Sequence, residues 1–340
     1  MEKRCDIIMP VWNQHAFTKD CIDSIFKNTD SSYRLIIIDN ASDDETSAYL
    51  DSLKDKNGNP PVLVVRNEKN EGFIKAVNKG IGLSDAPYIC ILNNDTLVTK
   101  DWLETMISIM ESHDDIGIVN PSSNTLGQRP AQGEPVELYA KELKSQSAKY
   151  MELGAAIGFC MLVKRIVIQR IGLFDEIYGM GNFDDTDFSR RAIKEGFLCV
   201  RACGAYVYHR EKTSFNKVNT FDKDFKRNRE IFEFRWGKPK RVLYILDSYD
   251  GNILKRLNLE AMKLARSGNW VWYVSKEPLD MPLHSNIRFV QLGEKWFYLK
   301  AAFTVLKKKK RFDEIFVGGE KLANFLNSIS YFHKARIAYY

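Results

Sequence analysis

Three groups of acidic and amide side chains in the first 210 residues have types and spacing suited to chemistry. The first is Asn93-Asn94-Asp95, directly after the apolar residues 88–92. A carboxylate fixed where a buried strand ends can hold a hard divalent cation, and such a cation bridges two phosphate oxygens of a nucleotide diphosphate. Asn-Asp pairs also make ordinary turns, so this motif alone leaves both interpretations open.

The second group begins at Asp39, at the end of the apolar run 34–39. Residues 42–45 are explained by helix capping, because Ser and Asp accept the free N–H groups of a first turn and acids there oppose the helix dipole. Asp39 itself is not explained by capping. Its carboxylate is suited to accept a hydrogen bond from a nucleobase N–H.

The third group is Asp184-Asp185-Thr186-Asp187, at the start of a helical pattern. Three acids are more than a cap needs, and a carboxylate here can take a proton from an attacking hydroxyl. Asp187 and Arg191 are four residues apart and can pair. His209 ends the last apolar run of this region; a lone histidine is more often structural, and only proximity to Asp95 would make it a metal ligand.

Small and amide residues between positions 70 and 80 approach the same rim of the candidate site. Asn70 and Gly72 precede a helical pattern that carries Ala76, Asn78 and Gly80. Gly72 allows the backbone to approach a ligand, whereas small residues four apart allow close helix packing. Packing and ligand binding explain this pattern equally well.

The elements that must position these residues alternate between strand and helix. We predict strands at 5–9, 34–39, 62–65, 88–92 and 116–119, and helices at 17–27, 44–55, 73–82 and 101–111. This βα alternation predicts a mostly parallel sheet with helices on both faces. In such sheets ligands bind beyond the carboxyl ends of the strands, where Trp12-Asn13 and the groups above fall.

The rest of the first domain is less regular. Residues 122–148 are polar and without period, which predicts an ordered loop or a flap over the site. Further strands are predicted at 154–163, 198–200 and 205–208, and helices at 167–171 and 186–195. A domain of residues 1–215 results.

A charged connection at 216–240 then leads to a second, smaller open α/β module of Rossmann-like type at 241–340. Its predicted strands are 242–246, 271–274, 287–292 and 314–317, and its predicted helices are 252–267, 295–308 and 320–333. The chain stops at 337–340 within a strand-like pattern, so we expect a fragment of a longer protein.

Composition bounds the class of protein. The 340 residues are 44% hydrophobic and 28% charged, as in globular proteins. No stretch approaches about 20 apolar residues, and the first residues lack the core of a signal peptide. The six cysteines are expected to be reduced and structural. The location expected is the cytoplasm, including a position at the inner face of the membrane.

Charge is unevenly divided. The formal net charge is +6, yet residues 237–340 hold 19 Lys and Arg against 9 Asp and Glu, a surplus of ten. This asymmetry indicates two modules, the second facing an anionic partner such as a membrane surface or carrying a merely solvated basic face. The basic run 307–311 fits either a helix C-terminus or a surface near lipid-linked acceptors.

Taken in order, these segments resemble the family-2 glycosyltransferases with the GT-A fold over about residues 5–215. The agreement of several motifs in sequence order is far more specific than any one of them. The matching stretches are 8–13, 38–42, 70–72 with Ala76 and Asn78, 92–95, 158–165, 172–176 and 183–187. The module after them resembles the opening half of a GT-B glycosyltransferase.

The resemblance implies roles for individual residues. Asp39 would contact the base, Asp95 would bind Mn²⁺ or Mg²⁺, and Asp185 would be the catalytic base. The family's metal motif often holds two or three acids, whereas Asp95 is its single carboxylate here, which makes His209 more valuable as a ligand. The usual Glu before the base is Asp184, so either acid is a candidate. The expected donor-binding residues are Pro10, Trp12, Asn13, Asp39, Asn70, Gly72, Asn78, Asn93 and Asn94.

The resemblance implies a metal-dependent, inverting glycosyltransferase that moves a sugar from a UDP- or dTDP-linked donor to a hydroxyl of a glycan or lipid-linked saccharide. We expect a role in cell-surface polysaccharide synthesis and no nucleic-acid partner. A nucleotidyltransferase would need a glycine-rich loop with Arg and Lys after the first strand, where residues 10–14 have neither. The remaining alternative is a non-catalytic nucleotide-sugar-binding or assembly module, in which the acids only cap helices.

Overall fold

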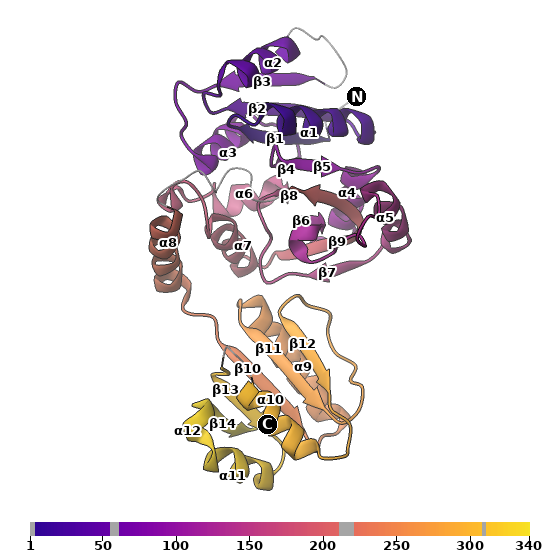
Figure 1. The fold of residues 1–340 in the computed structure, drawn as a ribbon, viewed down its shortest axis with the longest axis vertical. Helices are drawn as coiled ribbons and strands as arrows, with labels where there is room; N and C mark the ends of the chain where they lie inside the picture. Colours follow the sequence, from indigo (N-terminus) through magenta and orange to yellow (C-terminus); the bar gives the residue numbers. More distant parts are fainter. Residues whose placement is uncertain (1–3, 55–60, 211–220, 308–310) are drawn as a thin grey trace. The chain divides into compact units, whose positions relative to one another are not determined.

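The computed structural model describes residues 4–54, 61–210, 221–307 and 311–340. The chain forms two compact units (Figure 1). Unit 1 comprises Met1–Met151 and Ala155–Arg235, and unit 2 comprises Glu152–Gly154 and Trp236–Tyr340. Each unit has a sheet of its own and is described separately.

Unit 1 is built on a nine-stranded sheet in the order β3-β2-β1-β4-β8-β6-β9-β5, with β7 paired to β9. The strands from β3 to β4 are parallel, whereas β8 runs antiparallel to both of its neighbours. The bounds are β1 (Cys5–Val11), β2 (Tyr33–Asp39), β3 (Val62–Arg66), β4 (Tyr88–Leu92), β5 (Thr96–Val98), β6 (Ile116–Ser122), β7 (Tyr150–Glu152), β8 (Cys160–Lys164) and β9 (Leu198–His209).

Helices flank this sheet, and the central strands are buried along their length because they are continuous apolar runs. The helices are α1 (His15–Asn28), α2 (Asp44–Lys54), α3 (Phe73–Gly82), α4 (Trp102–Ser112), α5 (Val136–Leu143), α6 (Arg165–Ile171), α7 (Asp184–Lys194) and α8 (Phe221–Trp236), with short 3₁₀ turns η1 (Asn124–Leu126), η2 (Lys144–Gln146) and η3 (Glu176–Tyr178). The mostly parallel α/β fold is confirmed.

Several local predictions were wrong. The stretch 122–148 is not a plain loop, because it contains α5 and two 3₁₀ turns. The strand predicted at 154–163 begins at Cys160, and the strands predicted at 198–200 and 205–208 are one strand, β9. Strand β5 was not predicted. It has three residues and exists by pairing with β9, a contact that no local pattern indicates.

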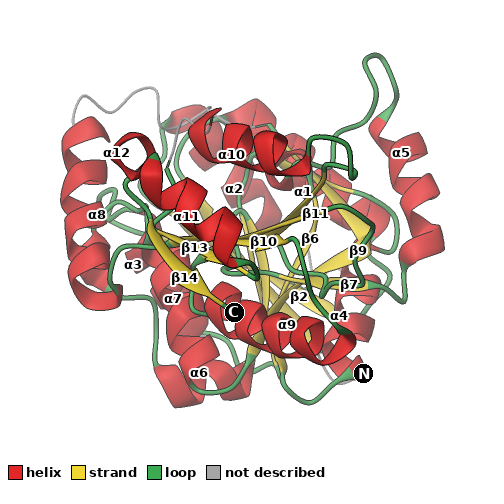
Figure 2. Cartoon of the chain, turned by 90° about the horizontal axis from the view of Figure 1, so that it is seen from below, coloured by secondary structure: helices red, strands yellow, loops and turns green. Residues whose placement is uncertain are grey.

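Unit 2 is a five-stranded, wholly parallel sheet in the order β12-β11-β10-β13-β14. Helix α9 covers one face, and α10, α11 and α12 lie on the other (Figure 2). The bounds are β10 (Arg241–Leu246), α9 (Gly251–Arg266), β11 (Trp270–Ser275), β12 (Ile287–Gln291), α10 (Phe297–Lys307), β13 (Glu314–Val317), α11 (Glu320–Ser328), α12 (Ser330–His333) and β14 (Arg336–Tyr339).

The predicted Rossmann-like alternation of this unit is confirmed, although the helix predicted at 320–333 is two helices separated at Ile329. The predicted connection 216–240 contains α8, and its residues 216–220 lie outside the described residues, as do 308–310 of the basic run. Within the described ranges, no helix has both the length and the hydropathy needed to cross a bilayer.

Candidate active site

Unit 1 contains a cavity of about 340 Å³ at the carboxyl ends of β1 and β4. Most of the predicted site residues line it. They are Pro10, Trp12, Asn70, Gly72, Asn93, Asn94, Asp95, Asp184, Asp185 and His209. Parallel strands of one sheet end at the same edge, and this brings motifs from the whole first unit together.

Asp95 and His209 lie side by side in the cavity. Their carboxylate Oδ1 and imidazole Nε2 are 3.1 Å apart, and both side chains are largely buried. The contact follows from the register of β5 on β9, which places Thr96 opposite His209. The proximity that would distinguish a ligand from a structural histidine is therefore present.

Two contacts outside the Asp95 pair fix the orientation of the His209 ring. Its Nδ1 is 2.9 Å from Thr125 Oγ1, and Phe159 stacks on the ring at 5.2 Å between centroids. Metal-binding histidines usually have their second nitrogen held in this way, because the hydrogen bond fixes the tautomer and aims the other nitrogen at the ion. Thr125 belongs to the stretch predicted to be loop, so sequence reasoning missed it.

These two side chains fit a Mg²⁺ or Mn²⁺ ion bound mainly through a substrate. Such ions often take one or two carboxylates from the protein and complete their shell with phosphate oxygens and water. No group of three or more His, Cys, Asp or Glu suited to a metal occurs among the described residues. Asp95 and His209 would thus supply two ligands and leave the others to a diphosphate.

Asp184 and Asp185 open helix α7 on another wall of the cavity. Burial, together with the negative charge of Asp185, raises the pKa of Asp184 to about 7. Burial also raises the pKa of Asp185, against hydrogen bonds donated by Gly158 N to Oδ2 at 3.1 Å and by Thr186 N to Oδ1 at 2.6 Å. A carboxyl with a pKa near neutrality is matched to proton transfer.

Asp39 and Asn13 do not line the cavity, although both were predicted to bind the donor. The Asp39 carboxylate is buried and accepts hydrogen bonds from Ser42 N at 2.9 Å and from Arg66 Nη1 at 2.7 Å. Asn13 accepts a bond from Asp43 N through Oδ1 at 2.7 Å. Both side chains hold the turns after β1 and β2 together, and the contact of Asp39 with a base stays a prediction.

Asn78 lies on α3 and also falls outside the cavity lining. Its amide exchanges two hydrogen bonds with the backbone of Phe174, donating through Nδ2 at 2.9 Å and accepting through Oδ1 at 3.0 Å. This is the pattern of a structural tie, because the side chain imitates a backbone partner. Asn78 therefore anchors the segment that leads to α7.

Hydrogen bonds hold three rim residues, Asn40, Asn70 and Gly72, together. Asn40, a cavity residue, donates from Nδ2 to Gly72 O at 3.2 Å, and Asn70 Oδ1 accepts from Gly72 N at 2.9 Å. Gly72 has φ +87°, and a Cβ there would lie 2.8 Å from Met180 Sδ. The positive φ favours glycine, and an added Cβ would also require the Met180 side chain to move.

Other cavity residues were not predicted. Met180, Gly181 and Asn182 belong to the segment just before α7, and Asp224 comes from α8. Gly179 and Gly181, with positive φ, flank Met180 and were a sequence signal for a special backbone at this place. Asp224 lies in a charged stretch that offers no such signal.

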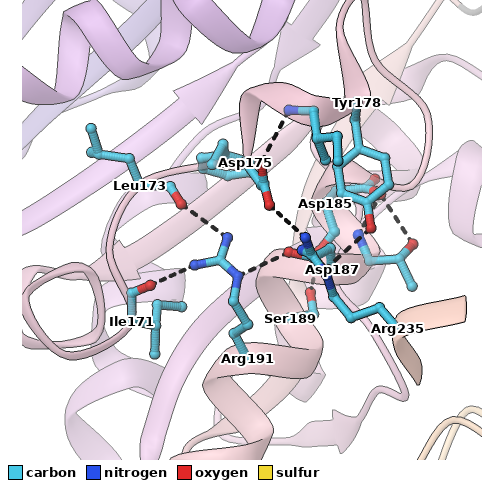
Figure 3. Close-up of polar contacts among 12 residues, drawn as sticks. Ile171, Leu173, Asp175, Tyr178, Asp185, Asp187, Ser189, Arg191 and Arg235 are labelled. Carbon is cyan, nitrogen blue, oxygen red and sulfur yellow. Dashed lines mark hydrogen bonds and ion pairs between the residues drawn. The ribbon is translucent and has the colours of Figure 1, made fainter. Parts of the chain in front are cut away.

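Behind the acidic pair lies a buried ionic network (Figure 3). Asp187, wholly buried, accepts from Arg191 Nε at 2.9 Å and from Arg235 Nη1 at 2.8 Å. The predicted pairing of Asp187 with Arg191 is thereby confirmed. Arg235, on α8, also donates from Nη2 to Asp175 Oδ2 at 2.8 Å. A buried carboxylate needs such partners, because an unpaired buried charge is strongly destabilising.

Unit 2 has a sheet crossover of its own, between β10 and β13. There Asp247 Oδ1 accepts from Gly318 N at 3.0 Å, and the Tyr340 hydroxyl donates to Ser248 O at 2.9 Å. A Cβ on Gly318 would lie 2.6 Å from the Tyr340 hydroxyl oxygen. Side chains of the unit itself thus occupy the place where such sheets bind ligands.

Sequence comparisons find similarity over a large part of unit 1. Residues 6–172 match the family described as Glycosyl transferase family 2. The glycosyltransferase GlyG of Streptococcus pneumoniae is 26% identical over 114 residues, which are 34% of this chain and 37% of that protein. The uncharacterized glycosyltransferase RP339 of Rickettsia prowazekii is 27% identical over 175 residues, 50% of this chain and 53% of its own. The chain thus spans about a third to a half of these relatives.

Solved structures share the fold at low identity. A mannosyltransferase of Pyrobaculum calidifontis in complex with GDP-Man and Mn²⁺ is 16% identical with a TM-score of 0.50, covering 63% of this chain and 59% of that chain. GalNAc-T7 with UDP, GalNAc and Mn²⁺ is 17% identical with a TM-score of 0.54, covering 67% and 48%. TarS of S. aureus in complex with UDP-GlcNAc is 13% identical with a TM-score of 0.52, covering 78% and 73%.

Proposed function

This chain belongs, through residues 6–172, to glycosyl transferase family 2, and from that premise we propose that it transfers a sugar from a nucleotide diphosphate donor to a hydroxyl acceptor with inversion. The observation that carries the proposal is the composition of the cavity at the carboxyl ends of β1 and β4. It unites a carboxylate–imidazole pair, Asp95 and His209, with an acidic pair of raised pKa, Asp184 and Asp185.

Asp95 and His209 would hold Mn²⁺ or Mg²⁺ against the diphosphate. When bound, the ion stabilises the negative charge that grows on the leaving nucleotide. That two solved structures with this fold contain Mn²⁺ is consistent with such a cofactor. Arg210 N donates to Asp95 O at 3.0 Å and so fixes the backbone that carries the carboxylate.

One acid of the pair Asp184 and Asp185 takes the acceptor proton. The acceptor oxygen then forms a bond to the anomeric carbon as the bond from that carbon to the diphosphate oxygen breaks on the opposite side. One such displacement inverts the configuration, and the proton ends on the carboxylate. We favour Asp185 as the base from the order of the acids, with Asp184 as the other candidate.

The first test is calorimetric titration of UDP and dTDP with and without Mn²⁺, on the wild type and on Asp95→Ala. We expect binding that requires Mn²⁺ and is lost in the variant. Absence of binding under every condition would contradict the transferase and favour an assembly module. With a donor identified, Asp185→Asn should lose turnover and keep donor binding, whereas a binding module would be unaffected.

For the donor we propose a UDP- or dTDP-linked sugar, and for the acceptor a growing surface glycan or a lipid-linked saccharide. We propose that the protein acts in the cytoplasm, at the inner face of the membrane.

An exposed apolar stripe on α10 supports the membrane contact. Trp296, at the start of the helix, is 65% exposed, and Leu299, Phe303 and Leu306 are also exposed on the side opposite the buried Ala301. An exposed apolar stripe of this kind marks an interaction surface, for another protein or for a membrane.

Charge favours lipid over protein as the occupant of this stripe. Residues 294–340 hold ten Lys and Arg against four Asp and Glu, and eight of the ten are lysine. Lysine is depleted at protein interfaces, whereas it is attracted to anionic lipid headgroups. The proposed partner is therefore an anionic bilayer.

Co-sedimentation with vesicles tests the contact. We expect the wild type to bind vesicles containing phosphatidylglycerol, and a Trp296→Ser, Phe303→Ser double variant to bind at least about tenfold more weakly, because two aromatic side chains are lost from the interface. Leu259→Ser is the matched control, since Leu259 is 61% exposed on α9, which covers the other face of the sheet. If the wild type does not co-sediment with anionic vesicles, the membrane contact is ruled out.

A further inference from the structure

The segment that delivers the acidic pair has a strained backbone. In the loop 179–183, Gly179, Gly181, Asn182 and Phe183 have φ values of 61°, 127°, 72° and 69°. Asn adopts this left-handed conformation readily, but for the bulky Phe183 it is unfavourable and persists only where surrounding structure enforces it. Because helix α7 begins at Asp184, the path of this loop sets the position of both acids.

Helix α8 supplies that enforcement through a buried amide. Asn228 is fully buried and donates from Nδ2 to Tyr178 O and to Gly181 O, both at 2.8 Å. One side chain therefore bridges the residue before the loop and its third residue. The ring of Phe183 packs against Phe225 and Phe232 of the same helix, with centroids 5.2 Å and 5.4 Å apart.

A second connection runs through the buried ionic network (Figure 3). Arg235 on α8 donates to Asp187, which lies one turn after Asp184 on α7, and to Asp175, which precedes the loop. Tyr178 also donates from its hydroxyl to Asp187 Oδ1 at 3.3 Å. A single guanidinium thus joins both ends of the segment that carries the loop.

We infer that α8 positions the acidic pair for catalysis, with Asn228 and Arg235 as positioning residues that act through the loop 179–183 and Asp187. This inference rests on the proposed function. It concerns residues beyond 172, where the family match ends. Neither Asn228 nor Arg235 lines the cavity, so their effect on the reaction is transmitted through the backbone of the loop.

The variants Arg235→Ala and Asn228→Ala test this inference in the whole chain. We expect turnover to fall about 100-fold, because a displacement of roughly 1 Å at a reacting group has that effect. Binding of UDP and Mn²⁺, measured by calorimetry, and KM for the donor should stay within about twofold, because Asp95 and His209 are untouched. Arg235→Lys should recover only a part of the turnover. The lysine keeps the positive charge, but it cannot bond two carboxylates as a guanidinium does.

Arg229→Ala is the matched control on the same helix. Arg229 is about half exposed and pairs with Glu233 four residues on, at 2.8 Å, so its loss should change nothing. Unaltered turnover in both test variants would overturn the inference. So would an equal loss of turnover and of UDP binding, because that pattern reports general unfolding.

Hydrogen exchange separates this inference from the proposed function. Backbone amides of residues 178–187 should exchange faster in Asn228→Ala and Arg235→Ala than in the wild type and in Arg229→Ala. If the wild type transfers no sugar from any donor, the proposed function fails, and this measurement still decides the role of α8. Unchanged exchange in both variants would refute it.

Discussion

At the scale of single residues, the candidate site depends on carboxylates in unequal surroundings. Asp95 faces an imidazole, Asp187 is paired with two guanidinium groups, and Asp184 has neither partner while it neighbours the like charge of Asp185. Environments of this kind separate groups that stay ionised from groups that exchange a proton. Residue type alone does not distinguish them.

The raised pKa of Asp184 predicts a dependence of stability on pH. The folded state keeps its proton up to about pH 7, whereas an unfolded aspartate loses it near the ordinary value of 3.8. Between these values the folded state binds more protons, so the free energy of unfolding falls as pH rises. Asp184→Asn should remove this fall and be more stable than the wild type at pH 8 by about 1–3 kcal/mol. Urea unfolding at pH 5 and pH 8 measures both.

The same variant identifies the base. If Asp185 is the base, Asp184→Asn retains transfer, and the acidic limb of its pH–rate profile moves to lower pH because a neighbouring negative charge is gone. If Asp184 is the base, this variant is inactive and Asp185→Asn keeps part of the activity. Equal activity of both variants with the wild type would exclude the pair from catalysis.

At the scale of elements, small residues decide how closely the helices of the site approach the sheet. Helix α3 follows Gly72 of the cavity rim and carries Asn78, which is hydrogen-bonded to the backbone of Phe174. The helix packs on β1 at Gly80. A Cβ on Gly80 would clash with Ile8 Cγ2 on that strand. The β-branched Ile8 is stiff and fully buried, so it has little freedom to yield.

Two glycines of α3 give a matched pair of variants. Gly80→Ala should destabilise the protein by about 1–3 kcal/mol through overpacking. Gly82→Ala should be neutral or stabilising by up to about 1 kcal/mol, since nothing lies within 4 Å of its added Cβ and alanine is the better helix former. Denaturant midpoints compare them, and equal midpoints would show that the approach of α3 to β1 relaxes without cost.

At the scale of the whole molecule, the chain consists of two units with separate sheets and separate apolar cores. The proposed donor site lies entirely in unit 1. Ligand binding stabilises the part of a protein that holds the ligand. Donor binding and folding of unit 2 should therefore be separable.

Calorimetric unfolding tests this separation. We expect two transitions, of which UDP with Mn²⁺ raises the Tm of one by several degrees and leaves the other in place. Asp95→Ala should show the same two transitions without the shift. A single transition that moves as a whole would mean that the two units unfold cooperatively.

The sequence alone determined the order and type of most elements, because apolar periodicity reports which backbone is buried and how. It also determined that polar groups stand at strand ends, and hence most of the cavity lining. Its errors concerned short or irregular elements such as β5 and α5, which exist through packing with distant segments.

Tertiary structure alone decided which polar side chains meet. Asp95 and His209 come together through the pairing of β5 with β9, and the loop 179–183 gains Asn228 from a helix beyond a charged stretch. Asp39 and Asn78 have side chains suited to binding a donor and lie near the cavity. They are instead hydrogen-bonded to Arg66 and to the backbone of Phe174, respectively. The physical reason is that a hydrogen-bonding side chain takes the partner that packing brings nearest, and that choice is not encoded in local spacing.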